Sequence, residues 1–329
     1  METATVSVII PAFNYGRFIA RTIQSLQAQT LTDWECLVVD DGSSDDTGEV
    51  VAAITASDPR IKYLRQPNAG LGAARNAGLR ATSGKFVQFL DADDLIGPRK
   101  LERQAEILRT HPEVDLVYGD ARYFREATPD SLRVEWDRRF STVSGAGEPL
   151  LSALLVDNIM VVQASLTRRP LLERVGGFDP RLPRLEDWDC WIRCALTGAV
   201  FLHDSDAGPD CRSYVRVHRA SMSNDSEAML RTAVAVRGLI HPSLPLRLRP
   251  ANTRRIHQSE AELALREALG HRPRDGAVKL LRLGVTERHV RWLVLGCAVP
   301  FLRLRPGRWA LKSWRRLRTP APDSANWIE

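Results

Sequence analysis

The sequence has few cysteines, no long apolar run and no familiar phosphate-binding glycine loop. Its five cysteines among 329 residues are scattered and include no Cys-x-x-Cys pair. That pattern argues against a disulfide framework or a zinc site and favours reduced thiols, so we expect a cytoplasmic protein. No apolar run reaches the roughly 18 to 20 residues that span a bilayer. The run from Val6 to Ile10 is also too short for the core of a signal peptide.

Two common nucleotide-binding motifs are also missing. The nearest approach to a dinucleotide fingerprint is GLGAAR at 70–75, which has arginine where that fingerprint needs glycine or alanine. The segment also follows the third expected strand and lacks a well-placed acid about 20 residues further on. No G-x-x-x-x-G-K-[ST] motif occurs. Dehydrogenases and P-loop nucleotide hydrolases are therefore disfavoured.

Acidic side chains become rare towards the end of the chain. Residues 230–329 hold 20 Lys and Arg against 7 Asp and Glu, whereas residues 1–229 hold 26 against 33. The overall charge of +6 thus hides an acidic front and a strongly basic tail. Such a tail suggests an anionic partner, which could be a membrane surface, nucleic acid or an acidic polymer.

The first hundred residues alternate between short apolar runs and helical patterns. Strands are expected at Val6–Ile10, Glu35–Asp40, Ile61–Arg65 and Phe86–Leu90. The segment 41–47 is expected to make a turn whose Asp41 and Ser43 cap the following helix. A small-residue helix is expected at Ala73–Ala81. Four strands alternating with helices predict an α/β protein with a doubly wound, mostly parallel sheet.

The chain is organised around the segment FVQFLDADD at 86–94. Asp91 and Asp93 follow a buried strand, and alternation places them on the same side of an extended segment. In an open α/β sheet this edge is where ligands bind. Two carboxylates there suit Mg²⁺ or Mn²⁺, which accept waters and phosphate oxygens as further ligands. A solvated turn or a helix N-cap is the alternative.

Four motifs in a fixed order resemble the family-2 glycosyltransferases with the GT-A fold. They are VSVIIPAFN at 6–14, VVDDGSSDDT at 38–47, NAGLGAARNAG at 68–78 and LDADD at 90–94. The resemblance covers residues 5–225. It implies an inverting, metal-dependent transfer from a nucleotide-diphosphate sugar, UDP-linked in our reading, to a glycan or lipid-linked acceptor. The product would be a surface polysaccharide or glycolipid.

The resemblance also assigns the donor site residue by residue. Pro11, Ala12, Asn14 and Tyr15 would flank the base and ribose, and Asp40 would accept from the uracil N3–H. Arg75 would face the phosphates, although a salt bridge with a nearby acid is its alternative role. The full set expected around the nucleotide sugar is Pro11, Ala12, Asn14, Tyr15, Asp40, Asn68, Gly70, Arg75, Asp91, Ala92 and Asp93.

The second half supplies the expected base. A helix is expected at Glu186–Leu196, and acids at its start are favoured by the helix dipole in any protein. The resemblance makes Asp187 the general base, with Glu186 as second choice. Trp188 and Trp191 could form a platform for the acceptor sugar, although aromatics at helical spacing usually belong to the core. His218, in a segment that resembles the family's closing loop, could be a third metal ligand beside Asp91 and Asp93 or a phosphate contact.

The domain prediction follows these motifs. Residues 1–228 are expected to form the catalytic domain, with a nucleotide-sugar half at 1–97 and an acceptor half at 98–228. Residues 125–150 read as a variable loop over the acceptor cleft. Residues 229–329 are expected to be a basic helical region whose apolar stretch 290–302 and following arginines either contact the inner membrane surface or cap the catalytic domain. The competing functions are a non-catalytic scaffold with this fold and a nucleotidyltransferase; nucleic-acid binding is disfavoured, because no known module is visible.

Overall fold

The structure is a computed structural model that describes residues 4–128, 131–138, 141–218, 221–270, 273–286 and 292–297. The chain divides into two units, Met1–Arg249 and Pro250–Glu329. The boundary therefore follows Arg249 rather than residue 228. Helix α8 (Ser226–Ile240) belongs to the first unit because it buries Val236 and Ile240 in that unit's core.

The nucleotide half follows the predicted alternation of strands and helices. Its elements are β1 (Val6–Ala12), α1 (Gly16–Gln27), β2 (Trp34–Asp40), α2 (Thr47–Thr55), β3 (Ile61–Arg65), α3 (Leu71–Ala81), β4 (Phe86–Phe89), β5 (Leu95–Ile96) and α4 (Lys100–Thr110). Each of the four strands expected here is present within two residues of its predicted bounds. One detail is wrong: neither Asp41 nor Ser43 caps α2, because both side chains bond to other segments of the chain.

The acceptor half adds shorter elements and a helical layer. In chain order they are β6 (Leu116–Tyr118), β7 (Ala121–Thr128), β8 (Ser131–Arg138), α5 (Gly147–Val156), η1 (Val162–Ala164), β9 (Ser165–Arg168), α6 (Arg169–Arg174), α7 (Glu186–Leu196), β10 (Phe201–His203), η2 (Pro209–Cys211), β11 (Ser213–Arg216), η3 (Met222–Asn224), α8 and η4 (His241–Ser243). The helix predicted at Glu186–Leu196 has those bounds in the structure.

The expected loop at 125–150 is wrong, because much of it is regular structure. Strands β7 and β8 pair antiparallel, and α5 begins at Gly147. The register places Tyr123 opposite Trp136 and Phe124 opposite Val134. β7 and β8 form an antiparallel ladder with register shifts, so the polar composition that suggested a loop was a poor guide to the backbone conformation of this segment.

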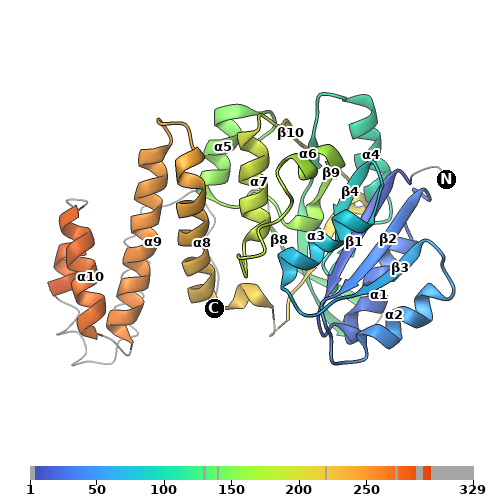
Figure 1. Ribbon diagram of the computed structural model, residues 1–329, viewed down its shortest axis with the longest axis horizontal. Coiled ribbons are helices and arrows are strands. Elements are labelled where there is room, and N and C mark those ends of the chain that lie inside the picture. Colours follow the sequence, from blue (N-terminus) through green and yellow to red (C-terminus); the bar gives the residue numbers. More distant parts are fainter. Residues whose placement is uncertain are drawn as a thin grey trace. The chain divides into compact units, whose positions relative to one another are not determined.

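A seven-stranded sheet carries the fold, in the order β10-β6-β9-β4-β1-β2-β3 (Figure 1). All its neighbouring strands run parallel except β9, which runs antiparallel to both β4 and β6. This mostly parallel, doubly wound sheet confirms the predicted α/β class. Strands β5, β11, β7 and β8 form a second sheet.

Helices cover both faces of the main sheet. Ile9 and Leu37 point into a core shared with α3, α5 and α7, whereas Val8 and Ile10 point into a core shared with α1 and α4. Helix α3 lies close to β1 because its small residues permit it: a Cβ on Gly78 would lie 2.3 Å from the Ile9 Cγ2 atom. This close packing brings the N-terminus of α3 to the carboxyl edge of the sheet.

The second unit consists of helices with a small core of its own. Helices α9 (Arg249–Leu269) and α10 (Pro273–Thr286) pack through Ala264, Leu265 and Leu280, and residues 292–297 are helical as well. Trp292 packs partly buried against this core, and the expected contact of the stretch 290–302 with a membrane or with the catalytic domain stays a prediction. The arginines from Arg303 to Arg318 lie outside the described residues. Among the helices that the structure describes, none has both the length and the apolar character needed to cross a bilayer.

Candidate active site

The predicted donor residues gather at the carboxyl edge of the main sheet. Parallel register pairs Ala12 at the end of β1 with Asp40 at the end of β2. The β4 strand runs parallel on the other side of β1 and leads directly into the loop that begins at Asp91. One edge of the sheet therefore presents the loops that follow three neighbouring strands.

Asp40 is held as an anion by its neighbours. Its Oδ1 accepts the backbone N–H of Ser43 at 2.7 Å, and its Oδ2 accepts the Tyr63 hydroxyl. Burial alone would raise the pKa of Asp40, but these hydrogen bonds outweigh it and lower the pKa below its usual value. The burial and the Asp40 bond raise the pKa of Tyr63 to about 12. Tyr63 was not singled out from the sequence, because its contact with Asp40 arises only from the pairing of β2 with β3.

The loop after β1 is tied to the loop after β2. Asn14 has a φ of 62°, and its Oδ1 accepts the backbone N–H of Ser44 at 2.8 Å. Its own N–H donates to the Ser43 hydroxyl. Pro11 and Ala12 are buried in β1, so among the expected base-flanking residues only Asn14 and Tyr15 have substantial exposure.

The loop after β3 is anchored by Asp41. Asp41 accepts the backbone N–H groups of Ala69 and Gly70 at 2.9 and 2.8 Å. Asn68 is exposed beside them. Gly42, with a φ of 84°, lies so near this segment that a Cβ would be 3.0 Å from the Asn68 nitrogen. The motifs at 38–47 and 68–78 thus fold against each other.

Asp93 and His218 are in direct contact. The His218 Nε2 lies 2.8 Å from the Asp93 Oδ2, and the histidine ring lies 5.3 Å from that of Phe18 and 6.3 Å from that of Tyr15. Burial, assisted by the charges of Asp93 and Asp91, raises the pKa of Tyr15. The aromatic residue expected to stack on a base therefore lies beside the acidic loop.

Asp91 points to a different partner. Its Oδ1 accepts from Arg75 Nη2 at 2.7 Å. Burial raises the pKa of Asp91, Arg75 opposes that shift, and the nearby Asp93 adds to it. The described part of the chain contains no group of three His, Cys, Asp or Glu side chains arranged to hold a metal ion. The predicted set of Asp91, Asp93 and His218 is thus not assembled as a three-ligand site.

The oxygen atoms that remain suit a cation shared with a ligand. Asp91 gives one oxygen to Arg75 and Asp93 gives one to His218, so each carboxylate has a second oxygen. The backbone between them is fixed, because the Thr22 hydroxyl donates to the carbonyl of Ala92 at 2.8 Å. Mg²⁺ and Mn²⁺ are commonly bound through one or two carboxylates together with phosphate oxygens and waters. The residues present fit that kind of site.

The third acid of the motif has a structural role. Asp94 is buried, and its Oδ1 accepts the backbone N–H of Arg216 at 2.7 Å while its Oδ2 accepts from Gln163. The Arg216 Nε donates in return to the carbonyl of Asp93 at 2.7 Å. These bonds attach the strand that leads to His218 directly to the acidic loop. Sequence reasoning missed Arg216 and Gln163, because both act across more than 65 residues of sequence.

Arg75 links the two halves of the site. This buried guanidinium is 1% exposed and forms one ion pair with Asp91 and a second with Glu186. It also stacks 5.2 Å from the Phe178 ring. Arg75 thus makes the salt bridges that were its alternative role, and its contact with phosphate stays a prediction. The pairing also places the start of α7 beside the acidic loop.

The same pairing separates the two candidates for the base. Glu186 is buried against Arg75, whereas Asp187 is only partly buried. The Asp187 carboxylate accepts from the Trp188 backbone N–H at 2.7 Å and from Asn158 Nδ2 at 2.9 Å. Burial and the charge of Glu186 raise the pKa of Asp187 to about 7. A carboxylate with such a pKa is suited to accept a proton near neutral pH.

The prediction that Trp188 and Trp191 form a platform for the acceptor sugar is wrong. Trp188 and Trp191 are 3% and 0% exposed, so neither offers a ring face to a sugar. Trp188 Nε1 donates to the carbonyl of Leu154, and Trp191 packs against Phe178. The helical spacing of these aromatics reflects the buried side of α7, which faces the core.

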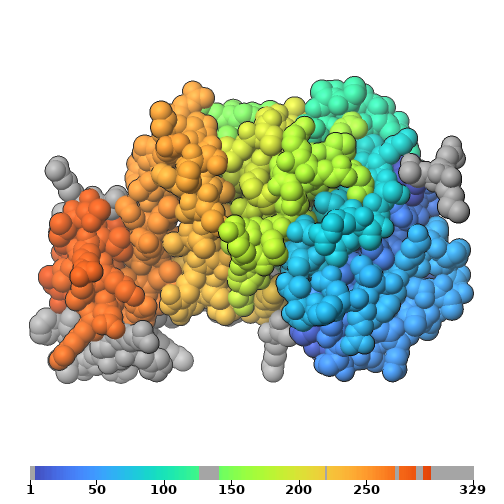
Figure 2. Space-filling model, in the orientation of Figure 1, coloured from blue at the N-terminus to red at the C-terminus, as the bar shows by residue number. Residues whose placement is uncertain are grey.

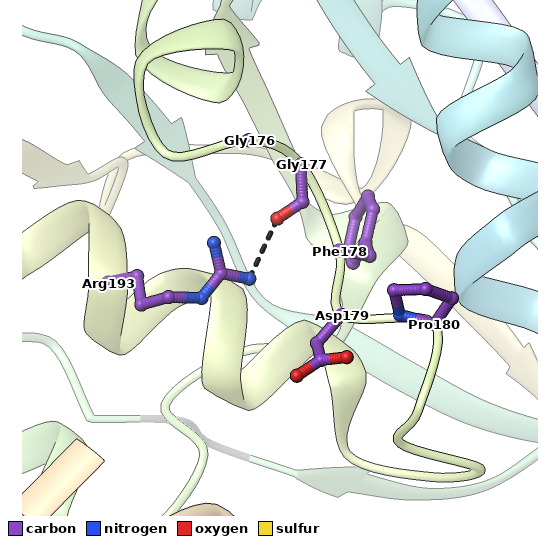
Figure 3. Close-up of a pocket in the computed structure, with 6 residues that line it drawn as sticks. All are labelled: Gly176, Gly177, Phe178, Asp179, Pro180 and Arg193. Atoms are coloured by element: carbon purple, nitrogen blue, oxygen red, sulfur yellow. Dashed lines mark hydrogen bonds between the residues drawn. The ribbon is translucent and has the colours of Figure 1, made fainter. Parts of the chain in front are cut away.

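The loop before α7 is pinned from both sides. Arg193 donates to the carbonyl of Gly177 at 2.7 Å beside a pocket lined by Gly176, Gly177, Phe178, Asp179, Pro180 and Arg193 (Figure 3). From α3, Asn76 binds both the carbonyl and the N–H of Phe178. Figure 2 shows α3 and this loop touching on the surface. Phe178 is thereby fixed against the Arg75 guanidinium.

Curated relatives of this chain are glycosyltransferases. The chain is 33% identical over 228 residues to an uncharacterized glycosyltransferase from Nostoc sp., covering 66% of each chain. It is 34% identical to the uncharacterized glycosyltransferase EpsJ of Bacillus subtilis, covering 55% of this chain and 53% of that one. The chondroitin synthase of Escherichia coli is 30% identical, with 59% and 27% covered. The matched part of the chain thus covers at most about two thirds of the length of each of these relatives.

Solved structures share the fold. TarS of S. aureus in complex with UDP-GlcNAc superposes with a TM-score of 0.62 at 19% identity, covering 91% of this chain and 87% of that one. The mannosyltransferase PcManGT of Pyrobaculum calidifontis, in complex with GDP-Man and Mn²⁺, gives 0.56 at 20% identity, covering 92% and 88%. These likenesses confirm the GT-A architecture. The family model "Glycosyl transferase family 2" matches residues 7–175. The chain therefore belongs to glycosyl transferase family 2.

Proposed function

We propose that the chain transfers a sugar from a UDP-linked donor to a hydroxyl of a glycan or lipid-linked acceptor, with inversion at the anomeric carbon. The observation that carries the proposal is the link through Arg75, which joins Asp91 of the acidic loop to Glu186 beside Asp187. In this proposal Arg75 holds together the loop that would face the diphosphate and the helix start that carries the proton acceptor, and the pKa of Asp187, raised to about 7, suits that acceptor role. Such a product would suit the building of a cell-envelope polysaccharide.

The reaction needs one displacement and no enzyme nucleophile. Asp187 takes the proton of the acceptor hydroxyl while the hydroxyl oxygen bonds to the anomeric carbon from the side opposite the diphosphate. The bond to the diphosphate breaks and the nucleoside diphosphate leaves. A divalent cation held by Asp91 and Asp93 would supply positive charge to that leaving group. Asp40, Asn14 and Tyr15 hold the nucleoside in this proposal, with Asp40 accepting from the base.

Calorimetric titration with UDP and GDP tests the donor assignment. In the presence of Mn²⁺ we expect UDP to bind, and we expect chelator or Asp93→Ala to weaken it at least about tenfold, because the cation loses a carboxylate ligand. Glu113→Ala, which removes an exposed carboxylate before β6, should leave the affinity unchanged. Preference for GDP would mean that the donor is GDP-linked rather than UDP-linked, and Asp40 would then lose its role as acceptor for the uracil N3–H. Failure to bind either nucleotide would favour the scaffold reading.

We also propose that the basic tail contacts an anionic membrane surface. The sequence from Arg303 to Arg318 carries seven Lys and Arg with Trp309 and Trp314 among them. Each cation near an anionic bilayer contributes about 1 kcal/mol. Replacing Arg315, Arg316 and Arg318 by Gln should therefore lower the partition coefficient onto phosphatidylglycerol vesicles, measured by sedimentation, by roughly a hundredfold. Equal sedimentation of wild type and variant would refute the contact, and phosphatidylcholine vesicles serve as the uncharged control.

A further inference from the structure

The proposed base is held from outside its own helix by Asn158. This residue lies in the loop that follows α5, and its Nδ2 donates to Asp187 Oδ2 at 2.9 Å. The other carboxylate oxygen accepts the N–H of Trp188 at 2.7 Å. Each oxygen of Asp187 therefore has a fixed donor, and the two donors come from different elements of the acceptor half.

The loop that carries Asn158 is itself fixed. Its next residues, Ile159 and Met160, are buried in the main core. The carbonyl of Leu154, near the end of α5, accepts the indole N–H of Trp188 at 2.8 Å. The backbone N–H of Asn158 donates to Asp157 Oδ1. Two hydrogen bonds thus join the end of α5 to the start of α7, and one of them is made by the Asn158 amide.

The orientation of that amide is informative. Its nitrogen faces the carboxylate, while its oxygen is buried and has no hydrogen-bond partner among the residues that the structure describes. An unpaired buried oxygen costs about 1–3 kcal/mol. An amide that only filled space would lose this free energy with no compensating hydrogen bond, whereas leucine has a similar shape and no polar atoms to leave unpaired. The side chain makes sense as a donor directed at Asp187.

We propose that Asn158 is a positioning residue for the base, an inference that rests on the proposed function. The amide holds the Asp187 carboxylate in one rotamer and favours its ionised form, which is the form that accepts a proton. The other charged groups that influence Asp187 are Glu186, on the same helix, and Arg75, from α3. Asn158 acts against the effect of Glu186 and in the same direction as Arg75.

The test is release of UDP from UDP-sugars without an acceptor, with Mn²⁺, where water takes the place of the acceptor hydroxyl. The variants are Asn158→Leu, which keeps the shape and removes the donor, and Asn158→Asp, which also adds a negative charge. Val156→Ala, at the exposed last residue of α5 just before that loop, is the matched control. A hydrogen bond to a charged group predicts a fall in kcat of roughly ten- to a hundredfold with an unchanged KM for the donor.

The pH profile separates positioning from structure. Without the amide donor the acid limb of kcat/KM should move to higher pH, and further for Asn158→Asp than for Asn158→Leu, while calorimetric UDP affinity stays at the wild-type value. If the wild type releases UDP and both variants release it with the same kcat and the same acid limb, this inference alone is overturned. No release by wild type from any UDP-sugar overturns the proposed function and the inference with it. If Asn158→Leu fails to fold, Asn158→Asp decides.

Discussion

Asp187→Asn should lower turnover by about 10²- to 10⁴-fold while leaving the donor site intact. Asparagine keeps the size of the side chain but cannot accept the proton, and general base catalysis typically contributes about 10²- to 10⁴-fold to the rate. We therefore expect kcat to fall within that range. UDP affinity should be unchanged, because the hydrogen bonds of Asp187 go to Asn158 and Trp188, which are not donor residues. Steady-state kinetics and calorimetry on the same preparation make the comparison.

Glu186→Gln is the matched variant, because the two residues are neighbours with different surroundings. Glu186 is 3% exposed and its carboxylate pairs with Arg75. Its replacement should lower thermal stability, since Arg75 loses half of its ion pairing, and should affect turnover less than Asp187→Asn does. The opposite ranking, with Asp187→Asn active and Glu186→Gln folded but inactive, would move the role of base to Glu186.

The pH dependence of the wild type follows from the same assignment. Burial and Glu186 raise the pKa of Asp187 to about 7, and only the ionised carboxylate accepts a proton. The ionised fraction falls as pH drops through 7, so kcat/KM should fall about tenfold per pH unit below that point and level off above it. The decline should not appear in UDP affinity over the same range.

The strands and the acidic loop were predictable because their signals are local. Three of the first four strands are short, mainly apolar runs, and the loop from Asp91 to Asp94 directly follows one of them. The start of α7 at Glu186 was predictable for the same reason: acids cluster where the helix begins. Resemblance to a family then gave those local features a function. The family match ends at residue 175, so it does not reach the proposed base.

The predictions that were wrong or missing concern features that depend on contacts between distant segments. Arg75 and Glu186 are separated by 111 residues, and no spacing rule connects them. Trp188 and Trp191 were ambiguous because helical spacing does not say which side of α7 faces the core. Asn158 gave no signal at all, since an Asp-Asn pair after a helix reads as an ordinary turn. The hairpin of β7 and β8 was hidden by the polar residues around it.

Arg75→Met should cause a large loss of stability. The substitution leaves the Glu186 carboxylate buried without its cation and removes the partner of Asp91. Breaking a buried ion pair on one side typically costs about 3–5 kcal/mol, because the remaining charge has lost both water and partner. Chemical denaturation should show a loss of that size in the free energy of unfolding.

A surface ion pair provides the control, and a second substitution tests the cause. Arg109→Met removes an exposed pair with Glu106 at 3.8 Å, and such pairs are worth about 0–1 kcal/mol. Adding Glu186→Gln to Arg75→Met should recover part of the lost stability, because the stranded charge disappears. If Arg75 instead served mainly as a phosphate contact, Arg75→Met would retain wild-type stability and lose UDP affinity. That result would return the residue to the donor site and leave the link between the two halves to Asn76 and Phe178.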